Sequence, residues 1–192
     1  MKTLNELMSA GKDAAICLSA ANSAPLTYAQ LRSLAQYVQT EFNRIGIGRN
    51  DRVALVLPNG ADMASSFITV ASCCTSAPLN PAYRADEFEF YLNDLNAQAL
   101  VVEQGSTSPA VEVARKMGIA LVELVPTPER GAGSFTLNLA GFPSRAAQHP
   151  GPARADDVAL VLHTSGTTSR PKIVPLTHRN VTASARNIAN ST

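Results

Sequence analysis

The sequence predicts an α/β fold in which helices pack against a parallel sheet, and two observations support this class. Continuous apolar runs at residues 53–57 and 99–102 have the composition of strands that are covered on both faces. Segments with helical periodicity lie between such runs, so strands and helices alternate along the chain. Because consecutive parallel strands need a crossover connection, this alternation implies right-handed βα units.

The first long helix is expected to follow a capping box, in which Thr27 and Gln30 satisfy each other's free backbone groups. Its apolar residues recur every three or four positions, at Leu31, Leu34, Ala35, Val38, Phe42 and Ile45. Gly46 follows as a left-handed stop. After a turn at residues 48–51, residues 53–57 form the first buried strand.

The alternation continues beyond this strand. We predict helices at 61–75, 86–95 and 109–118, and strands at 77–79, 99–102 and 119–124. Ser108 followed by Pro109 is typical of a helix N-terminus. Cys73 and Cys74 fall in the first of these helices, where we interpret them as buried structural thiols. With Cys17 they are odd in number and lack Cys-x-x-Cys spacing, which indicates neither a disulfide framework nor a zinc site.

From residue 126 to residue 157 the pattern changes. Pro and Gly are frequent and periodicity is weak apart from a short strand at 135–137, so we expect a long surface connection. Strands at 158–162 and 173–176 then flank a polar loop, and Thr177 can cap a helix that begins at His178. We therefore divide the chain into a first βα subdomain (1–125), an irregular connection (126–157) and a loop-bearing segment (158–192).

The polar loop is the main candidate for a functional site. It contains no carboxylate, and its residues are Thr164, Ser165, Gly166, Thr167, Thr168, Ser169, Arg170, Pro171 and Lys172. Hydroxyl and N–H groups donate hydrogen bonds, glycine admits close approach, and the cations stabilise charge, so the loop suits a polyphosphate. It is not a Walker A loop, because Pro171 and Ile173 stand where that motif needs its second glycine and its hydroxyl residue.

This loop, with the Leu-Thr-His stretch at 176–178, resembles the phosphate-binding signature of the adenylate-forming superfamily. Acyl-CoA synthetases, luciferases and peptide-synthetase adenylation domains form that superfamily. Segments 26–31, 46–59 and 76–81 resemble its earlier motifs. Asn50 stands where many members have glycine, which implies a position where a residue tolerant of positive φ is needed. Residues 163–172 (His-Thr-Ser-Gly-Thr-Thr-Ser-Arg-Pro-Lys) are similar to the oxalate–CoA ligase branch. Most members have glycine in place of Ser169 and Ile173, and a β-branched residue at 173 favours extended backbone. The fold would then be the N-terminal part of the family's large domain.

The resemblance implies an ATP-dependent ligase that adenylates a small carboxylic acid and transfers it to coenzyme A, with oxalate as the acid that the branch suggests. Hydroxyl groups of the loop would hold the phosphates and Lys172 would be the catalytic residue that stabilises the departing pyrophosphate. We interpret Arg170 as solvated. In the family the adenine pocket, the acidic Mg²⁺ ligand and the C-terminal domain lie downstream. We therefore expect an N-terminal fragment that is inactive alone and holds no metal. The alternative is a folding or phosphate-binding module, or half of a split adenylating enzyme.

The remaining polar residues have plainer interpretations. The sequence offers no carboxylate partner for His163 or His178 and therefore does not favour a general-base role for either. We interpret His178, which begins a helix after the capping Thr177, as structural, and we expect His149 to be exposed. Asp156 and Asp157 are interpreted as solvated or capping residues rather than metal ligands.

Bulk properties exclude two classes of partner. The net charge is +1 and Lys and Arg residues do not cluster, so nucleic acid is not an expected partner. Apolar runs all fall well short of the ~18–20 residues that a membrane-spanning helix needs. We therefore expect a cytoplasmic protein.

Overall fold

Among residues 1–164 and 171–191, which the computed structural model describes, seven strands form one sheet in the order β7-β6-β5-β3-β4-β8-β9. Their bounds are β3 (Arg52–Val56), β4 (Thr75–Pro78), β5 (Ala99–Glu103), β6 (Ala120–Pro126), β7 (Phe135–Asn138), β8 (Val158–Thr164) and β9 (Lys172–Thr177). The five central strands run parallel, which confirms the predicted parallel sheet. The two edge strands, β7 and β9, pair antiparallel to their neighbours.

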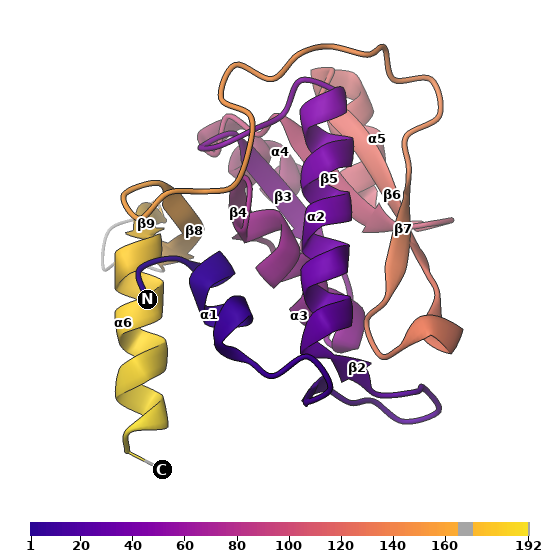
Figure 1. Cartoon of the computed structure of the whole chain (residues 1–192). Helices are drawn as coiled ribbons and strands as arrows, with labels where there is room; N and C mark the ends of the chain where they lie inside the picture. The colour runs from indigo at the N-terminus through magenta and orange to yellow at the C-terminus, as the bar shows by residue number, and fades with distance from the viewer. Residues whose placement is uncertain (165–170, 192) are drawn as a thin grey trace.

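Helices cover both faces of this sheet (Figure 1). They are α2 (Tyr28–Arg44) and α3 (Ala61–Ala71) on one face, and α4 (Ala85–Asp94) and α5 (Pro109–Met117) on the other. The alternation of side chains along β3 explains the two layers. Val53 and Leu55 pack in the cluster that contains Val38 and Phe42 of α2. Ala54 and Val56 pack in the opposite cluster, with Phe88 and Leu92 of α4.

Helix ends and one turn agree with the structure as predicted. Thr27 and Gln30 form the expected capping box at the start of α2. Ser108 caps α5, and Gly118 ends it in the left-handed conformation. Asn50 has a φ of 67°, as expected for a tolerant residue in a tight turn.

The helix predicted at 61–75 is wrong at its C-terminal end, since α3 stops at Ala71. The chain turns at residues 72–74 because β4 begins at Thr75, two residues earlier than predicted. Cys73 and Cys74 therefore lie in this turn and not in a helix. Both thiols are free and buried, as predicted, and burial raises the pKa of Cys74 well above its ordinary value.

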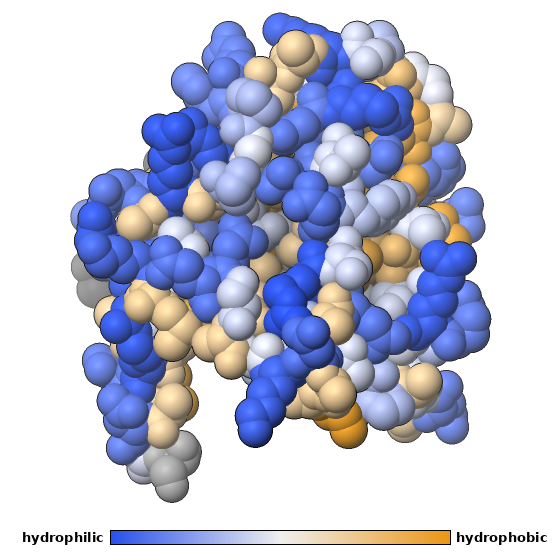
Figure 2. Space-filling view, in the orientation of Figure 1, coloured by the Kyte–Doolittle hydropathy of each residue, from blue (hydrophilic) through white to orange (hydrophobic). Residues whose placement is uncertain are grey.

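Sequence analysis missed the short elements at the N-terminus. They are α1 (Leu4–Ala10) and the antiparallel pair β1 (Ile16–Leu18) and β2 (Leu26–Thr27). Strands of two or three residues are too short to show a period. Helix α1 packs beside α6 (His178–Ala189), so the first and last helices of the described chain are neighbours (Figure 1). One side of α6 carries apolar residues (Figure 2).

The connection at 126–157 is largely irregular, as predicted, but it contains the turn η1 (Pro128–Arg130) and strand β7. It then arches over the C-terminal end of α2 (Figure 1). Backbone contacts fasten it there: Arg145 N donates to Arg44 O at 2.8 Å, and Arg49 N donates to His149 O at 2.9 Å. Strand β8 joins the same sheet as β3. The division of the chain into subdomains at residues 125 and 157 stays a prediction.

The contact between α3 and the turn that precedes β7 can be tested at glycines. Gly133 has a φ of +73°, and a Cβ there would lie 2.5 Å from the Ala61 carbonyl oxygen. Gly141 has a similar φ of +86°, but within the described part of the chain no neighbouring atom lies within 4 Å of the added carbon. We expect Gly133→Ala to lower the free energy of unfolding by about 1–3 kcal/mol more than Gly141→Ala does, because only the first adds a clash. Urea unfolding of both variants measures this difference, and equal losses would contradict it.

Candidate phosphate-binding site

Strands β8 and β9 form an antiparallel hairpin, and the predicted phosphate loop lies where the chain passes from β8 to β9. Thr164 pairs with Lys172, and on the preceding rung His163 pairs with Ile173. Residues directly opposite in an antiparallel pair share a face, and successive rungs alternate. Thr164 and Lys172 therefore project from one face of the hairpin, while His163 and Ile173 project from the other.

Of the nine predicted loop residues, the described part of the chain contains Thr164, Pro171 and Lys172. The others, Ser165, Gly166, Thr167, Thr168, Ser169 and Arg170, lie outside the described residues. Thr164 and Lys172 are both exposed. Among the described residues, Lys172 forms no ion pair with a carboxylate. The pair thus offers one hydroxyl and one cation to an anion at the mouth of the loop.

Asn50 anchors the first strand of the hairpin, a role that sequence analysis did not find. Its amide oxygen accepts from Val158 N at 2.9 Å, and its amide nitrogen donates to Asp157 at 2.8 Å. In addition, the Thr75 hydroxyl donates to Val158 O at 2.7 Å, next to the pair Ser76–Leu160 that joins β4 to β8. A run of more than one hundred residues separates Asn50 from this strand, so no local pattern indicates the contact.

Asp157 is not solvated, which was one of the two roles expected for it: its side chain is only 13% exposed and accepts several hydrogen bonds. It accepts hydrogen bonds from Arg154 N at 2.7 Å and from the Arg49 guanidinium at 3.2 Å. Burial favours the neutral acid, but the hydrogen bonds from Arg154 N and Asn50 and the charge of Arg49 outweigh it, so the pKa of Asp157 lies below its ordinary value. Asp156 is exposed and pairs with Arg179 at 2.5 Å.

His163 has a carboxylate partner, contrary to the sequence-based expectation. Its Nε2 lies 3.1 Å from Oδ2 of Asp94, the last residue of α4. The ring also meets the ring of Tyr91 edge-on, with centroids 4.7 Å apart. Asp94 is 69 positions away in the sequence, and only the packing of α4 on the sheet brings it here.

His178 is structural, as predicted, and is completely buried. Its Nδ1 accepts a hydrogen bond from Leu4 N at 3.2 Å, which ties α1 to the start of α6. Nε2 has no partner of acceptable geometry within the described chain. Burial is the main cause of a lowered pKa for His178; the nearby Ala71 carbonyl and the Asp157 carboxylate oppose it only in part. His149 is exposed, as expected.

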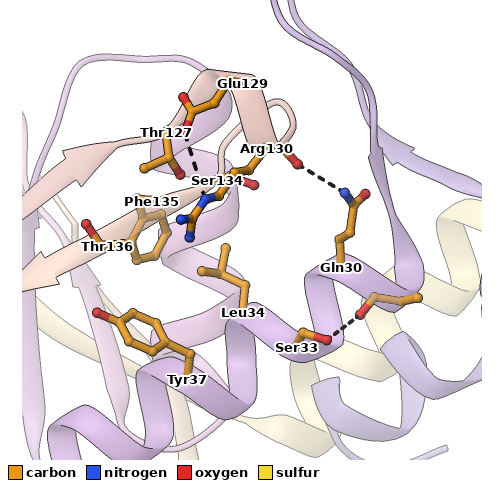
Figure 3. Close-up of a pocket in the computed structure, with 11 residues that line it drawn as sticks. Gln30, Ser33, Leu34, Tyr37, Thr127, Glu129, Arg130, Ser134, Phe135 and Thr136 are labelled. Atoms are coloured by element: carbon orange, nitrogen blue, oxygen red, sulfur yellow. Dashed lines mark hydrogen bonds and ion pairs between the residues drawn. The ribbon is translucent and has the colours of Figure 1, made fainter.

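An open pocket of about 690 Å³ lies away from the hairpin, between α2, η1 and β7 (Figure 3). Leu34, Tyr37 and Phe135 supply apolar surface, and Arg130 reaches in from the rim. Gln30 ties the rim to α2 by donating to Arg130 O at 3.0 Å. Because β7 and β9 are the opposite edges of the sheet, this pocket is separate from the β8–β9 hairpin.

Within residues 1–164 and 171–191, no group of three His, Cys, Asp or Glu side chains is placed to hold a metal ion. In the same part of the chain, none of the helices is both long and apolar enough to cross a membrane.

The fold is that of the N-terminal region of adenylate-forming enzymes. Apo MatB from Rhodopseudomonas palustris matches 98% of this chain with a TM-score of 0.78 at 22% identity, using 37% of its own length. ATP-bound MatB from the same organism matches 98% of the chain with a TM-score of 0.76 at 24% identity, again over 37% of its length.

Residues 8–192 match the AMP-binding enzyme family, and the chain belongs to that family. An oxalate–CoA ligase of Saccharomyces cerevisiae is 37% identical over 86% of this chain and 36% of its own length. An oxalate–CoA ligase of Arabidopsis thaliana is 38% identical over 89% of this chain and 34% of its own length. The chain therefore spans about a third of the length of these relatives.

The buried His178 predicts a pH dependence of stability. Its folded pKa lies below the ordinary 6.5, so the unfolded chain takes up the proton first as the pH falls. The contribution of the neutral His178 to the free energy of unfolding is complete above about pH 6.5. It is lost as the pH falls through the folded pKa, and the free energy of unfolding then changes by no more than about 1.4 kcal/mol per pH unit.

We expect His178→Gln to lose this part of the dependence between pH 7.5 and pH 5, while the exposed His149→Gln keeps it. Urea unfolding across that range measures both variants. The same pH profile for His178→Gln and the wild-type chain would contradict the assignment.

Proposed function

We propose that this chain is the phosphate-binding part of an ATP-dependent acid–CoA ligase that acts on a small carboxylic acid, with oxalate as the first candidate. The observation that carries the proposal is the hairpin that pairs Thr164 with an exposed Lys172, both of them within the motif at 163–172. Family membership and two relatives named oxalate–CoA ligase support it.

The proposed reaction has two steps. A carboxylate oxygen attacks the α-phosphorus of ATP in line, the bond to the bridging oxygen breaks, and pyrophosphate leaves with the negative charge. The thiol of coenzyme A then attacks the acyl adenylate and releases AMP. Catalysis of the first step is mainly positioning and charge stabilisation.

In the first step Lys172 would hold the β- and γ-phosphates and stabilise the charge that grows on the departing pyrophosphate. The Thr164 hydroxyl would donate a hydrogen bond to the same phosphates, and the loop at 165–170 would complete their binding. Mg²⁺ would neutralise phosphate charge. The family resemblance implies that its acidic ligand lies downstream of the phosphate loop.

The binding of inorganic tripolyphosphate, ATP and GTP to this chain tests the proposal. Because the chain is expected to contact the phosphates alone, the three should compete about equally. Lys172→Ala should weaken all three by about 10- to 100-fold, the usual effect of losing a charge-assisted contact. Isothermal titration calorimetry gives the dissociation constants.

Lys116→Ala is the matched control, because Lys116 is an exposed lysine in the last turn of α5 and its loss changes the net charge equally. A tenfold preference for ATP would mean that the chain also contacts the adenosine, contrary to the proposal. Equal losses in the two lysine variants would show a general charge effect and overturn the role of Lys172.

A further inference from the structure

The phosphate hairpin is fastened to helix α4 one residue before the loop begins. The His163 side chain is only 7% exposed, and its Nε2 faces the Asp94 carboxylate at 3.1 Å. Tyr91, one helical turn earlier, holds the edge of the same ring at an interplanar angle of 67°. The imidazole is thus fixed by a polar contact and an aromatic contact, both from α4.

Across the rung, Ile173 packs against the apolar cluster formed by α4, α5 and the sheet. Both members of this rung therefore contact the layer beneath the hairpin. The next rung is Thr164–Lys172, which carries the exposed phosphate ligands. The two pairs are neighbours in one ladder. A displacement of His163 from its contacts with α4 would therefore also displace Thr164 and Lys172.

The position of Asp94 is unfavourable for the helix itself. A carboxylate in the last turn faces the negative end of the helix dipole. The other acidic residues of α4 include Asp86 and Glu87 in the first turn, where the dipole stabilises them. The contact with His163 offsets the unfavourable interaction between the Asp94 carboxylate and the negative end of the helix dipole.

We propose that Asp94 is a positioning residue of the phosphate site: acting through His163, it fixes the rung that presents Thr164 and Lys172 to the phosphates. This inference rests on the proposed function of the hairpin. Asp94 itself does not touch the phosphates in this account.

Simple electrostatics and the positioning role make opposite predictions for Asp94→Ala. A carboxylate near the hairpin repels a polyphosphate, so its removal should tighten binding if charge alone matters. If Asp94 positions the rung, its removal should weaken binding, because the site loses its preorganisation. The sign of the change therefore separates the two explanations.

The experiment measures tripolyphosphate binding by calorimetry for the wild-type chain, Asp94→Ala, Asp94→Asn and Asp86→Ala. We expect Asp94→Ala to weaken binding by about fivefold or more, as expected from a loss of preorganisation. Asp94→Asn should stay within about twofold of the wild type, because an amide oxygen can still accept from His163 Nε2–H. Asp86→Ala, which removes the same charge from the exposed start of α4, should not weaken binding.

Equal or tighter binding by Asp94→Ala would overturn the inference, and so would a loss of the same size in Asp86→Ala. Thermal unfolding serves as the second readout: the midpoint of Asp94→Ala should change little, because the Asp94 side chain is 39% exposed and such pairs add little stability. A drop in midpoint large enough to unfold the chain at the titration temperature would assign Asp94 to stability and overturn the positioning role.

Amide hydrogen exchange separates failure of this inference from failure of the proposed function. If the wild-type chain does not bind tripolyphosphate, the hairpin is not a phosphate site and the proposed function fails. Faster exchange at residues 158–164 and 172–177 in Asp94→Ala would still show that Asp94 fastens the rung. Exchange as slow as in the wild type would show that Asp94 does not fasten the rung.

Discussion

The burial of β3 on both faces is the constraint on which the other elements depend. Its side chains alternate between two apolar clusters, so helices must cover each face. Right-handed crossovers place α3 on one face and α4 and α5 on the other, because the step from β3 to β4 and the steps from β4 to β5 and β6 run in opposite directions across the sheet, and α2 packs beside α3. The fold thereby puts the C-terminal end of α4 beneath β8, and the contact between Asp94 and His163 is a consequence of this layering.

Much of this layering could be predicted from the sequence because it rests on local patterns. Apolar runs predicted the central strands, and capping residues such as Thr27 and Ser108 predicted where helices begin. The early end of α3 could not be predicted, because Cys73 and Cys74 continue its apolar composition while the start of β4 forces the turn. The antiparallel direction of the two edge strands, β7 and β9, could not be predicted either, because strand direction is set by pairing and not by composition.

In the candidate site, too, local features could be predicted from the sequence and contacts between distant residues could not. The chemistry of the loop could be predicted because hydroxyls, glycine and cations stand together in a short segment. The supports of the hairpin could not, because Asn50 and Asp94 reach it from distant parts of the chain. In the structure these supports hold β8 at its start and near its end, and they leave Thr164 and Lys172 exposed on the rung beside the loop. A stiff strand that ends in exposed donors is suited to binding by preorganised contacts.

A titration of the ¹⁵N-labelled chain with inorganic tripolyphosphate, followed through backbone amide shifts, tests the central claim most directly. The account predicts that the largest changes fall at Thr164 and Lys172 and their neighbours in β8 and β9. Changes centred instead on Tyr37 and Phe135, in the pocket at the opposite edge of the sheet, would contradict it.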